Sequence, residues 1–271
     1  MQAFENVTGK NNPELIRAAS LKDKKYRRKY GAFLADGTKL FSELCESGIE
    51  ICNVWINENT KDRILPIIED ELKKRGDIPV RIAAPSAFSK LTDEAASEGI
   101  VCEVRFSPRH THAEYYSPKE DERVLMLSSL RDPGNLGTVA RSALAFNITR
   151  LILSADCVDI YSPKTLRAAM GAIFKLDITA VDDMEKTALE IKRCGRRVFA
   201  AELREGAVCL TDAGVKKSDV FIIGNEGHGI PEGLSAVCSN SVFIPINEQS
   251  ESLNAAAAAT VLLWHQSTAE D

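Results

Sequence analysis

Short apolar runs recur through the second half of the chain and alternate with segments of helical periodicity. The expected strands are 124–128, 151–154, 178–181, 198–201, 220–223 and 242–246, and the expected helices begin at Asn135 and cover 163–174 and 184–194. Continuous apolar runs are typical of buried parallel strands, and their alternation with helices is typical of a doubly wound sheet. The pattern therefore predicts an α/β fold that binds its ligands at the carboxyl ends of the strands.

The first 106 residues alternate in the same way on a smaller scale. The expected elements are a helix from Pro13 that continues into 22–30, a strand at 31–37, a helix at 38–47, strands at 54–56 and 79–82, and a helix at 64–75. Residues 107–122 contain two Ser-Pro pairs and little periodicity, which is typical of a linker. The pattern predicts a small α/β domain at 1–106, a linker at 107–122 and a larger domain at 123–271.

The stretch 241–264 combines a short strand, a polar loop and an almost bare helix. Ser252 and Asn254 stand where this helix begins, and five alanines follow at 255–259. Alanine favours helix and lets other backbone approach closely, so tight packing is expected here. The polar cluster places hydroxyl, amide and backbone N–H groups at the positive end of the helix.

The charge balance of the whole chain is slightly acidic. Lys and Arg number 34 against 39 acids, so the net charge is -5 and any nucleic-acid binding must depend on a local basic patch. The seven cysteines are scattered and never spaced as C-x-x-C, which is typical of reduced, mostly buried residues. Because neither a signal-peptide core nor a stretch of about 18 apolar residues occurs, we expect a soluble cytoplasmic protein without a membrane partner.

A dense positive run, KDKKYRRKY, covers residues 22–30. The run is either a solvated helix face or a phosphate-binding patch in which Tyr26 or Tyr30 stacks on a base. The candidate RNA-binding side chains are Lys22, Lys24, Lys25, Arg27, Arg28 and Lys29. His110 and His112 form an H-x-H pair, but no third ligand is suggested nearby, so no metal site is expected.

The loop after the first strand of the larger domain reads DPGNLGTVARSALAF, residues 132–146. Asn135 is a favourable N-cap for the helix that follows. Arg141 lies four residues after Gly137 on one helix face, so its guanidinium is expected to lean over bare surface at Gly137 toward the helix start. Arg141 is either an ion-pairing surface residue or a ligand for phosphate or carboxylate.

A second loop, in VFIIGNEGHGIPEGL at 220–234, runs from a buried strand into closely spaced glycines. The spacing G-x-x-G-x-G departs from the dinucleotide fingerprint, and Glu226 inside the turn would repel a pyrophosphate. A nucleotide-dependent oxidoreductase is therefore disfavoured, and a cofactor that carries positive charge fits better. His228 is expected to be a loop residue and not a catalyst.

Taken in order, N-x-G-x-x-x-R, an apolar strand with G-N-E-G, and I-P-I followed by S-L-N and the alanine-rich helix form a specific triple. This triple resembles the SpoU, or TrmH, family of RNA ribose 2′-O-methyltransferases in the SPOUT superfamily, over residue 124 to the end. Residues 163–171 look like the intervening helix of the family. The N-terminal NPELIRAASLKDKKYRRKYGAFLADGTKLFSEL resembles its L30e-like substrate-binding domain. Ala169 stands where serine is common, and Asn247-Glu248-Gln249 stands where glycine is usual.

The resemblance implies a C-terminal trefoil knot, a homodimer with RNA contacts from both subunits, and S-adenosylmethionine bound in the knot largely through backbone. The implied cofactor-binding residues are Gly224, Ile244, Leu253, Ala201 and Leu203, and the implied catalytic residues are Arg141, Asn135, Glu226, Ser252 and Asn254. Arginine is an awkward base because its pKa lies above about 12, so Arg141 is expected to position the phosphate and the hydroxyl.

The function that the resemblance implies is methyl transfer from S-adenosylmethionine to a ribose 2′-hydroxyl of RNA. Ribosomal RNA is favoured over transfer RNA because of the L30e-like domain. The alternatives are a transfer-RNA 2′-O-methyltransferase and a non-catalytic RNA-binding or ribosome assembly factor. The non-catalytic alternative is weaker because such a protein has no reason to keep Asn135, Arg141 and Glu226 in register.

Overall fold

The computed structural model describes residues 4–76, 78–94, 96–247 and 249–269. The chain forms two compact units, and each contains residues from separate parts of the sequence. The N-terminal unit consists of Met1–Ser107 and Tyr161–Phe174, and the C-terminal unit consists of Pro108–Ile160 and Lys175–Asp271. The second half of the chain therefore contributes a segment to the N-terminal unit.

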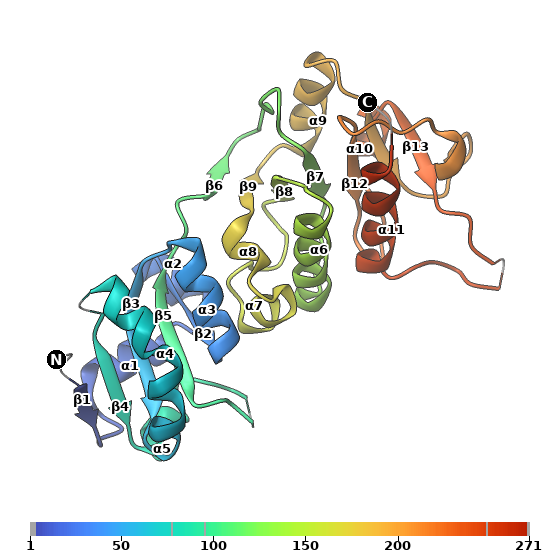
Figure 1. The fold of residues 1–271 in the computed structure, drawn as a ribbon. Coiled ribbons are helices and arrows are strands. Elements are labelled where there is room, and N and C mark those ends of the chain that lie inside the picture. The colour runs from blue at the N-terminus through green and yellow to red at the C-terminus, as the bar shows by residue number, and fades with distance from the viewer. Residues whose placement is uncertain (1–3, 77, 95, 248, 270–271) are drawn as a thin grey trace. The chain divides into compact units, whose positions relative to one another are not determined.

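The C-terminal unit is built on an eight-stranded sheet in which all the described pairings are parallel (Figure 1). Its strands, in spatial order, are β11 (Val208–Cys209), β13 (Asn240–Phe243), β10 (Val198–Ala201), β12 (Val220–Ile223), β7 (Val124–Leu127), β8 (Arg150–Ser154), β9 (Asp177–Val181) and β6 (His110–Ala113). The predicted α/β class with a parallel sheet is confirmed. β13 ends at Phe243 and not at residue 246, because Pro245 has no N–H to donate to a sheet.

Helices cover both faces of this sheet. They are α6 (Pro133–Ala145), α9 (Met184–Arg193), α10 (Glu232–Val237) and α11 (Ala255–Ser267), with a 3-10 turn, η2, at Leu210–Asp212. Ala200 packs with α9 and α10 in one core cluster, whereas its neighbour Ala201 lines a cavity with Ala258 of α11. Because successive strand residues point to opposite faces, α11 lies on the face opposite α9 and α10. None of the helices formed by described residues is long and apolar enough to cross a membrane.

The N-terminal unit contains a five-stranded mixed sheet. Its strands, in spatial order, are β1 (Phe4–Val7), β4 (Val80–Ala83), β3 (Ile51–Asn57), β5 (Ile100–Arg105) and β2 (Ala32–Asp36). Its helices are α1 (Pro13–Ser20), α2 (Lys24–Tyr30), α3 (Thr38–Ser47), α4 (Lys61–Arg75) and α5 (Pro85–Phe88), with η1 at Glu58–Thr60. The single helix expected from Pro13 to residue 30 is two helices, because the Asp23 carboxylate accepts a hydrogen bond from Lys25 N at 2.7 Å and caps α2.

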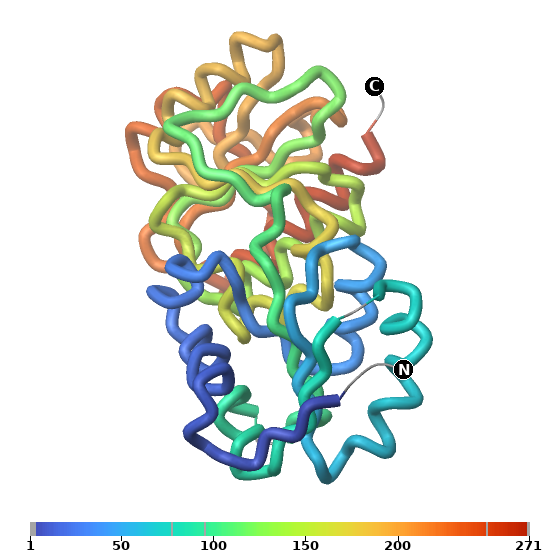
Figure 2. The backbone as a smooth tube through the Cα atoms, turned by 90° about the vertical axis from the view of Figure 1, so that its left-hand side faces the viewer, coloured from blue at the N-terminus to red at the C-terminus, as the bar shows by residue number. Residues whose placement is uncertain are grey.

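The segment Tyr161–Phe174 contributes to the core of the N-terminal unit. The rings of Tyr161 and Phe174 lie 4.5 and 6.0 Å from Phe33, and α7 (Pro163–Ala169) contacts β2 (Figures 1 and 2). The single helix expected at 163–174 is interrupted, because Met170 and Gly171 have φ of 49° and 89°, before α8 (Ala172–Lys175) begins. The aromatic contacts explain why this segment belongs to the N-terminal unit.

The segment expected to be a linker contains a strand of the large sheet. β6 pairs with β9 from His110↔Ile178 to Ala113↔Val181, and Ile178 N donates to Arg109 O at 3.0 Å. Three of its four side chains are polar, and Thr111 and His112 are exposed, so the sequence shows no apolar alternation there. Residues 110–113 are consequently held by backbone hydrogen bonds and do not form a free tether.

The cysteines are less buried than expected. All seven are free, but only Cys102 and Cys157 are buried, whereas Cys194 is exposed and the other four are half-buried. The expectation that most of them are buried is therefore wrong. Cys102 lies in the buried strand β5, and Cys157 is buried in the turn after β8.

Candidate active site

The loop after β7 leads into α6, whose first turn holds Asn135. Asp132 is the N-cap, and its Oδ1 accepts a hydrogen bond from Asn135 N at 2.8 Å. Pro133 occupies the first helical position, where its missing N–H carries no cost. The expectation that Asn135 caps the helix is therefore wrong, and the Asn135 side chain is left to make contacts outside α6.

Asn135 joins three loops that follow different strands. Its Nδ2 donates to Glu226 Oε1 at 2.8 Å, and its Oδ1 accepts from Asn254 Nδ2 at 2.9 Å. Asn254 Oδ1 in turn accepts from the backbone N of Ala256 and Ala257 at 2.9 and 3.3 Å, so Asn254 caps α11 as predicted. The three residues form one hydrogen-bonded chain across the carboxyl ends of β7, β12 and β13.

The loop after β12 is a tight hairpin, residues 225–229. Asn225 and Gly229 exchange two backbone hydrogen bonds of 2.9 and 3.0 Å, and Asn225 Nδ2 donates to Ser129 O at 2.7 Å. A Cβ on Gly224 would lie 2.5 Å from the carbonyl carbon of Gly229, so only glycine fits there. Asn225 is a structural anchor that the sequence analysis missed, although an asparagine followed by a glycine-containing turn is a recognised signal for a side chain that hydrogen-bonds its own loop.

Two adjoining cavities open beside these loops. The first, of about 190 Å³, has largely apolar walls and is lined by Ala201, Glu202, Leu203, Val242, Phe243, Ile244, Ile246, Glu251, Ser252, Leu253, Ala258 and Leu262. The second, of about 380 Å³, is lined by residues 223–227, 229, 252–255 and 258, and by Ala201 and Glu202. The structure therefore brings all five predicted cofactor-binding residues to the walls of two cavities that share residues.

The walls of these cavities fit S-adenosylmethionine in shape and charge. Apolar side chains such as Ile244 and Leu262 suit an adenine ring, and the bare backbone at Gly224 allows close approach. Glu226 and Glu251 contribute carboxylates, and the described residues that line the two cavities include no Lys or Arg. Opposite charges attract, so this environment favours a cofactor with a sulfonium and an ammonium group.

The remaining predicted catalytic residues occupy different places. Ser252 lines both cavities. Arg141 lies on the exposed surface of α6 and makes no hydrogen bond or ion pair within the described part of the chain. Gly137 is buried, so the expectation that Arg141 leans over bare surface at Gly137 is wrong. The structure brings Asn135, Glu226 and Asn254 together, and Arg141 makes no hydrogen bond or ion pair with these three described residues.

The basic helix α2 of the N-terminal unit presents only some of its charges to solvent. Lys24, Lys25, Arg28 and Lys29 are exposed. Arg27 is 4% exposed and donates to Leu21 O and Lys22 O at 2.8 and 2.6 Å, which satisfies carbonyls after α1. Lys22 pairs with Asp93 at 2.6 Å. The guanidinium of Arg27 is therefore occupied within the fold and is not presented to a phosphate.

A family model decides the class of this protein. The model of the SpoU rRNA Methylase family matches residues 122–264, which is more than half of the chain. The chain belongs to the SpoU rRNA methylase family. A second model, the MRM3-like substrate binding domain, matches residues 4–102.

Individual SpoU-family proteins resemble the chain over nearly its full length. It is 28% identical over 266 residues to the 23S rRNA (guanosine(2553)-2'-O)-methyltransferase RlmP of Bacillus subtilis, which covers 97% of this chain and 99% of that protein. The crystal structure of an AdoMet-bound rRNA methyltransferase from Sinorhizobium meliloti matches with a TM-score of 0.81 at 28% identity and covers 97% of each chain. The predicted class, an S-adenosylmethionine-dependent RNA 2′-O-methyltransferase, is thereby confirmed.

Proposed function

We propose that this protein methylates the ribose 2′-hydroxyl of a nucleotide in ribosomal RNA. The observation that carries the proposal is the hydrogen-bonded chain Glu226–Asn135–Asn254 beside the two cavities. This chain joins the loops in which sequence motifs of the SpoU family occur. Similarity to RlmP over almost the whole length supports ribosomal RNA as the substrate and makes transfer RNA the second candidate.

Each predicted site residue then has a definite part. S-adenosylmethionine, when bound, supplies a methyl group on a positively charged sulfur. The walls at Gly224, Ile244, Leu253, Ala201 and Leu203 hold it, and Ser252 offers a hydroxyl where the two cavities share residues.

Glu226 is placed to act on the acceptor. Asn135 holds Glu226 Oε1 at 2.8 Å, whereas Oε2 has only a long contact of 3.5 Å from Arg131 N. An ionised carboxylate accepts hydrogen bonds but donates none. Oε2 can therefore accept a hydrogen bond from the ribose hydroxyl and orient the hydroxyl oxygen for attack. Arg141 positions a phosphate next to the hydroxyl, in the role implied by the family resemblance.

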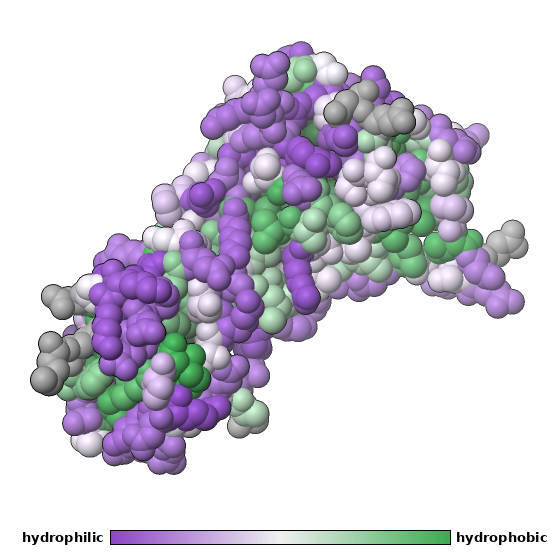
Figure 3. Space-filling model, viewed as in Figure 1, coloured by the Kyte–Doolittle hydropathy of each residue, from purple (hydrophilic) through white to green (hydrophobic). Residues whose placement is uncertain are grey.

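A knotted homodimer is part of the proposal. α11 follows β13 but packs on α6, and Ser142 Oγ lies 2.7 Å from Thr260 Oγ1 between the two helices. Trp264 is 57% exposed on α11, and apolar residues reach the surface in the region of α6 and α11 in Figure 3. Contact of this surface with a second copy would bury Trp264 and bring Arg141 close to the site of the other subunit.

The N-terminal unit is proposed to be an L30e-like domain that binds RNA through α2. Lys24, Lys25, Arg28 and Lys29 supply exposed charge, and Tyr26 and Tyr30 stack with ring centroids 6.3 Å apart. Such a surface attracts the phosphate backbone without reading sequence. The cytoplasm is the proposed location, because seven free cysteines suit a reducing compartment.

The decisive experiment is transfer of labelled methyl from S-adenosylmethionine to unmodified ribosomal and transfer RNA, followed by mapping of 2′-O-methyl positions. We expect one methylated nucleotide in ribosomal RNA, and no transfer by Arg141→Ala although that variant still binds the cofactor. Methylation of transfer RNA but not of ribosomal RNA would show that transfer RNA is the substrate. Absence of transfer with cofactor and RNA binding intact would favour a binding protein, and full activity of Arg141→Ala would refute the role of Arg141.

A further inference from the structure

A third cavity, of about 520 Å³, adjoins the second of the two cavities that fit the cofactor. It is lined by Ser129, Arg131, Asn225, Glu226, Gly227, His228, Gly229 and Pro231. Four of these residues, Asn225, Glu226, Gly227 and Gly229, also line the second cavity. Glu226 therefore lies on the wall shared by a cavity suited to the cofactor and a cavity whose volume is typical of a small-ligand site.

Arg131 supplies the positive charge of this third cavity. Its Nη2 donates to Asp156 Oδ2 at 2.6 Å, while Nε and Nη1 make no hydrogen bond within the described part of the chain. The side chain is 60% exposed. A guanidinium that is fixed by one nitrogen and keeps the others available is suited to bind a phosphate.

Asp156 is itself held firmly, so it can fix Arg131. Ser154 Oγ and Ser129 Oγ donate to the two carboxylate oxygens at 2.6 and 2.7 Å. Burial alone would raise the pKa of Asp156, but these hydrogen bonds and the charge of Arg131 hold it below its usual value. Ser129 also accepts a hydrogen bond at its carbonyl from Asn225, so the arginine support and the hairpin are one connected structure.

Arg131 and Glu226 line the same cavity, and their charges suit two neighbouring groups of a nucleotide. The backbone N of Arg131 lies 3.5 Å from Glu226 Oε2, so the two residues are in contact. In RNA the 2′-hydroxyl and the 3′-phosphate are attached to adjacent ribose carbons. A carboxylate accepts from the hydroxyl, and a guanidinium donates to the phosphate.

From this geometry we infer that the third cavity binds the acceptor nucleotide, with Arg131 as a second ligand, besides Arg141, for the phosphate next to the 2′-hydroxyl that donates to Glu226. The inference rests on the proposed function and adds a phosphate ligand to it. Arg141 lines none of the three cavities, whereas Arg131 lies beside Glu226 in the same chain. Arg131 is therefore a substrate-positioning residue that acts together with Glu226.

The test compares Arg131→Ala and Arg131→Lys with Arg193→Ala, a control at an exposed arginine on α9. With unmodified ribosomal RNA as substrate, Arg131→Ala should raise KM for RNA by about 10–100-fold, the worth of one charge-assisted contact. Arg131→Lys should recover part of the lost RNA affinity, because lysine keeps the positive charge but lacks the paired donors of the guanidinium. The Kd for S-adenosylmethionine, measured by calorimetry, should stay unchanged in all three variants.

Other results would overturn the inference. An unchanged KM for RNA in a folded Arg131→Ala protein would remove Arg131 from the acceptor site, and a raised Kd for S-adenosylmethionine would assign the third cavity to the cofactor. RNA binding with S-adenosylhomocysteine present needs no turnover and separates the two proposals. Wild-type protein that binds RNA through Arg131 but transfers no methyl would refute the proposed function and leave the binding site standing.

Discussion

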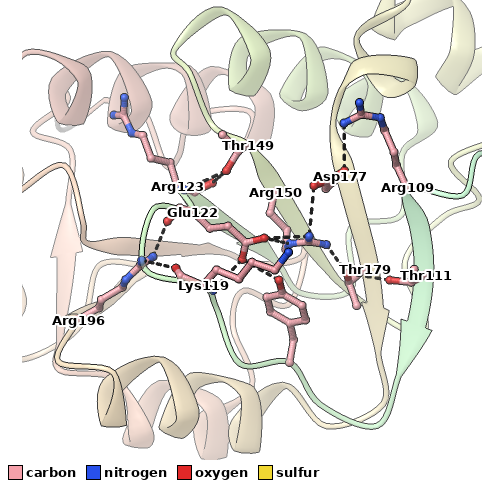
Figure 4. Close-up of polar contacts among 11 residues, drawn as sticks. Arg109, Thr111, Lys119, Glu122, Arg123, Thr149, Arg150, Asp177, Thr179 and Arg196 are labelled. Carbon is pink, nitrogen blue, oxygen red and sulfur yellow. Dashed lines mark hydrogen bonds and ion pairs between the residues drawn. The ribbon is translucent and has the colours of Figure 1, made fainter. Parts of the chain in front are cut away.

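The two ends of the eight-stranded sheet carry polar clusters of opposite character. At the amino ends of β7, β8 and β9 lies a closed ionic cluster formed by Glu122, Arg150, Asp177 and Thr179, whose side chains point toward one another (Figure 4). At the carboxyl ends lies the open chain Glu226–Asn135–Asn254. One sheet thus presents a completed network at one end and an unfinished one at the other.

The ionic cluster leaves little for a ligand. Arg150 donates to Glu122 and Thr179 at 2.9 Å and to Asp177 at 3.2 Å, and its side chain is 10% exposed. Arg196 donates to the backbone carbonyls of Lys119 and Glu122, which fastens the turn that carries Glu122. A buried charge with every donor matched supports the fold, because removal of any partner leaves an uncompensated charge.

The open chain differs because an acceptor atom remains available. Glu226 is exposed, and its Oε2 has only the long contact from Arg131 N. The side-chain amide of Asn135 donates to its Oε1 and does not neutralise the carboxylate. The comparison teaches that an unsatisfied, solvent-facing polar atom beside a cavity is a better guide to chemistry here than a dense set of charges.

The largest expected effect comes from Glu226→Gln at the open end. The amide keeps the size of the side chain and can still accept from Asn135, but it loses the charge that orients the hydroxyl. We expect methyl transfer to fall by about 10²–10⁴-fold, and the free energy of unfolding to change by less than about 0.5 kcal/mol. Steady-state transfer assays and urea denaturation measure the two quantities. A fully active Glu226→Gln enzyme would show that the open end of the sheet does not depend on the Glu226 carboxylate for function.

At the closed end, Arg150→Ala should act in the opposite way. It leaves Glu122, whose side chain is 11% exposed, without its charge partner, so the free energy of unfolding should fall by about 3–5 kcal/mol. Methyl transfer per folded molecule should stay unchanged when assayed well below the transition temperature. Arg193→Ala, at an exposed ion pair with Glu190, is the control and should cost at most about 1 kcal/mol. A stable Arg150→Ala protein with impaired transfer would contradict the division of roles.

The same contrast between occupied and available arginines applies to α2 of the N-terminal unit. Arg27→Ala removes buried hydrogen bonds and should lower the free energy of unfolding by about 1–3 kcal/mol. Arg28→Ala should leave stability unchanged and reduce the salt dependence of RNA binding by about one unit of slope. Titrations of RNA binding at several salt concentrations, paired with thermal melts, distinguish the two. Equal effects of both variants on the salt slope would show that burial does not separate them.

The smallest effect expected is a pH dependence of the closed cluster. Burial alone would raise the pKa of Glu122, but hydrogen bonds from Tyr116 and Arg150 outweigh it and hold the pKa below its usual value. Because the pKa of Glu122 is lower in the folded than in the unfolded protein, its ionised carboxylate stabilises the fold at pH values above the unfolded pKa of about 4.3. This stabilisation is lost as the pH falls through the folded pKa. Glu122→Gln should therefore show a shallower loss of stability below pH ~4 than wild type. Parallel acid titrations of the two proteins would disprove this assignment.

Local patterns in the sequence determined the class of the fold and most of its elements. The apolar runs at 198–201 and 220–223 are β10 and β12 to the residue, and Asn254 caps the helix that its position predicted. Capping and strand formation in these places depend on neighbouring residues, so they can be recognised without the tertiary structure. Local signals failed where two compete, as with Asp132 and Asn135 as caps of α6. The role of Glu248 lies outside the described residues.

Only the tertiary structure decided which polar groups meet. Asn135 finds Glu226 and Asn254 at separations of 91 and 119 residues, and β6 finds its partner β9 across the chain. Arg27 is buried while Arg28 is exposed, within one continuous basic run. Such pairings depend on strand order and on which helix face packs, and both are set by burial of apolar surface over the whole unit. A sequence motif can place Glu226 in a loop, but only the packing of β7 beside β12 brings Arg131 next to it.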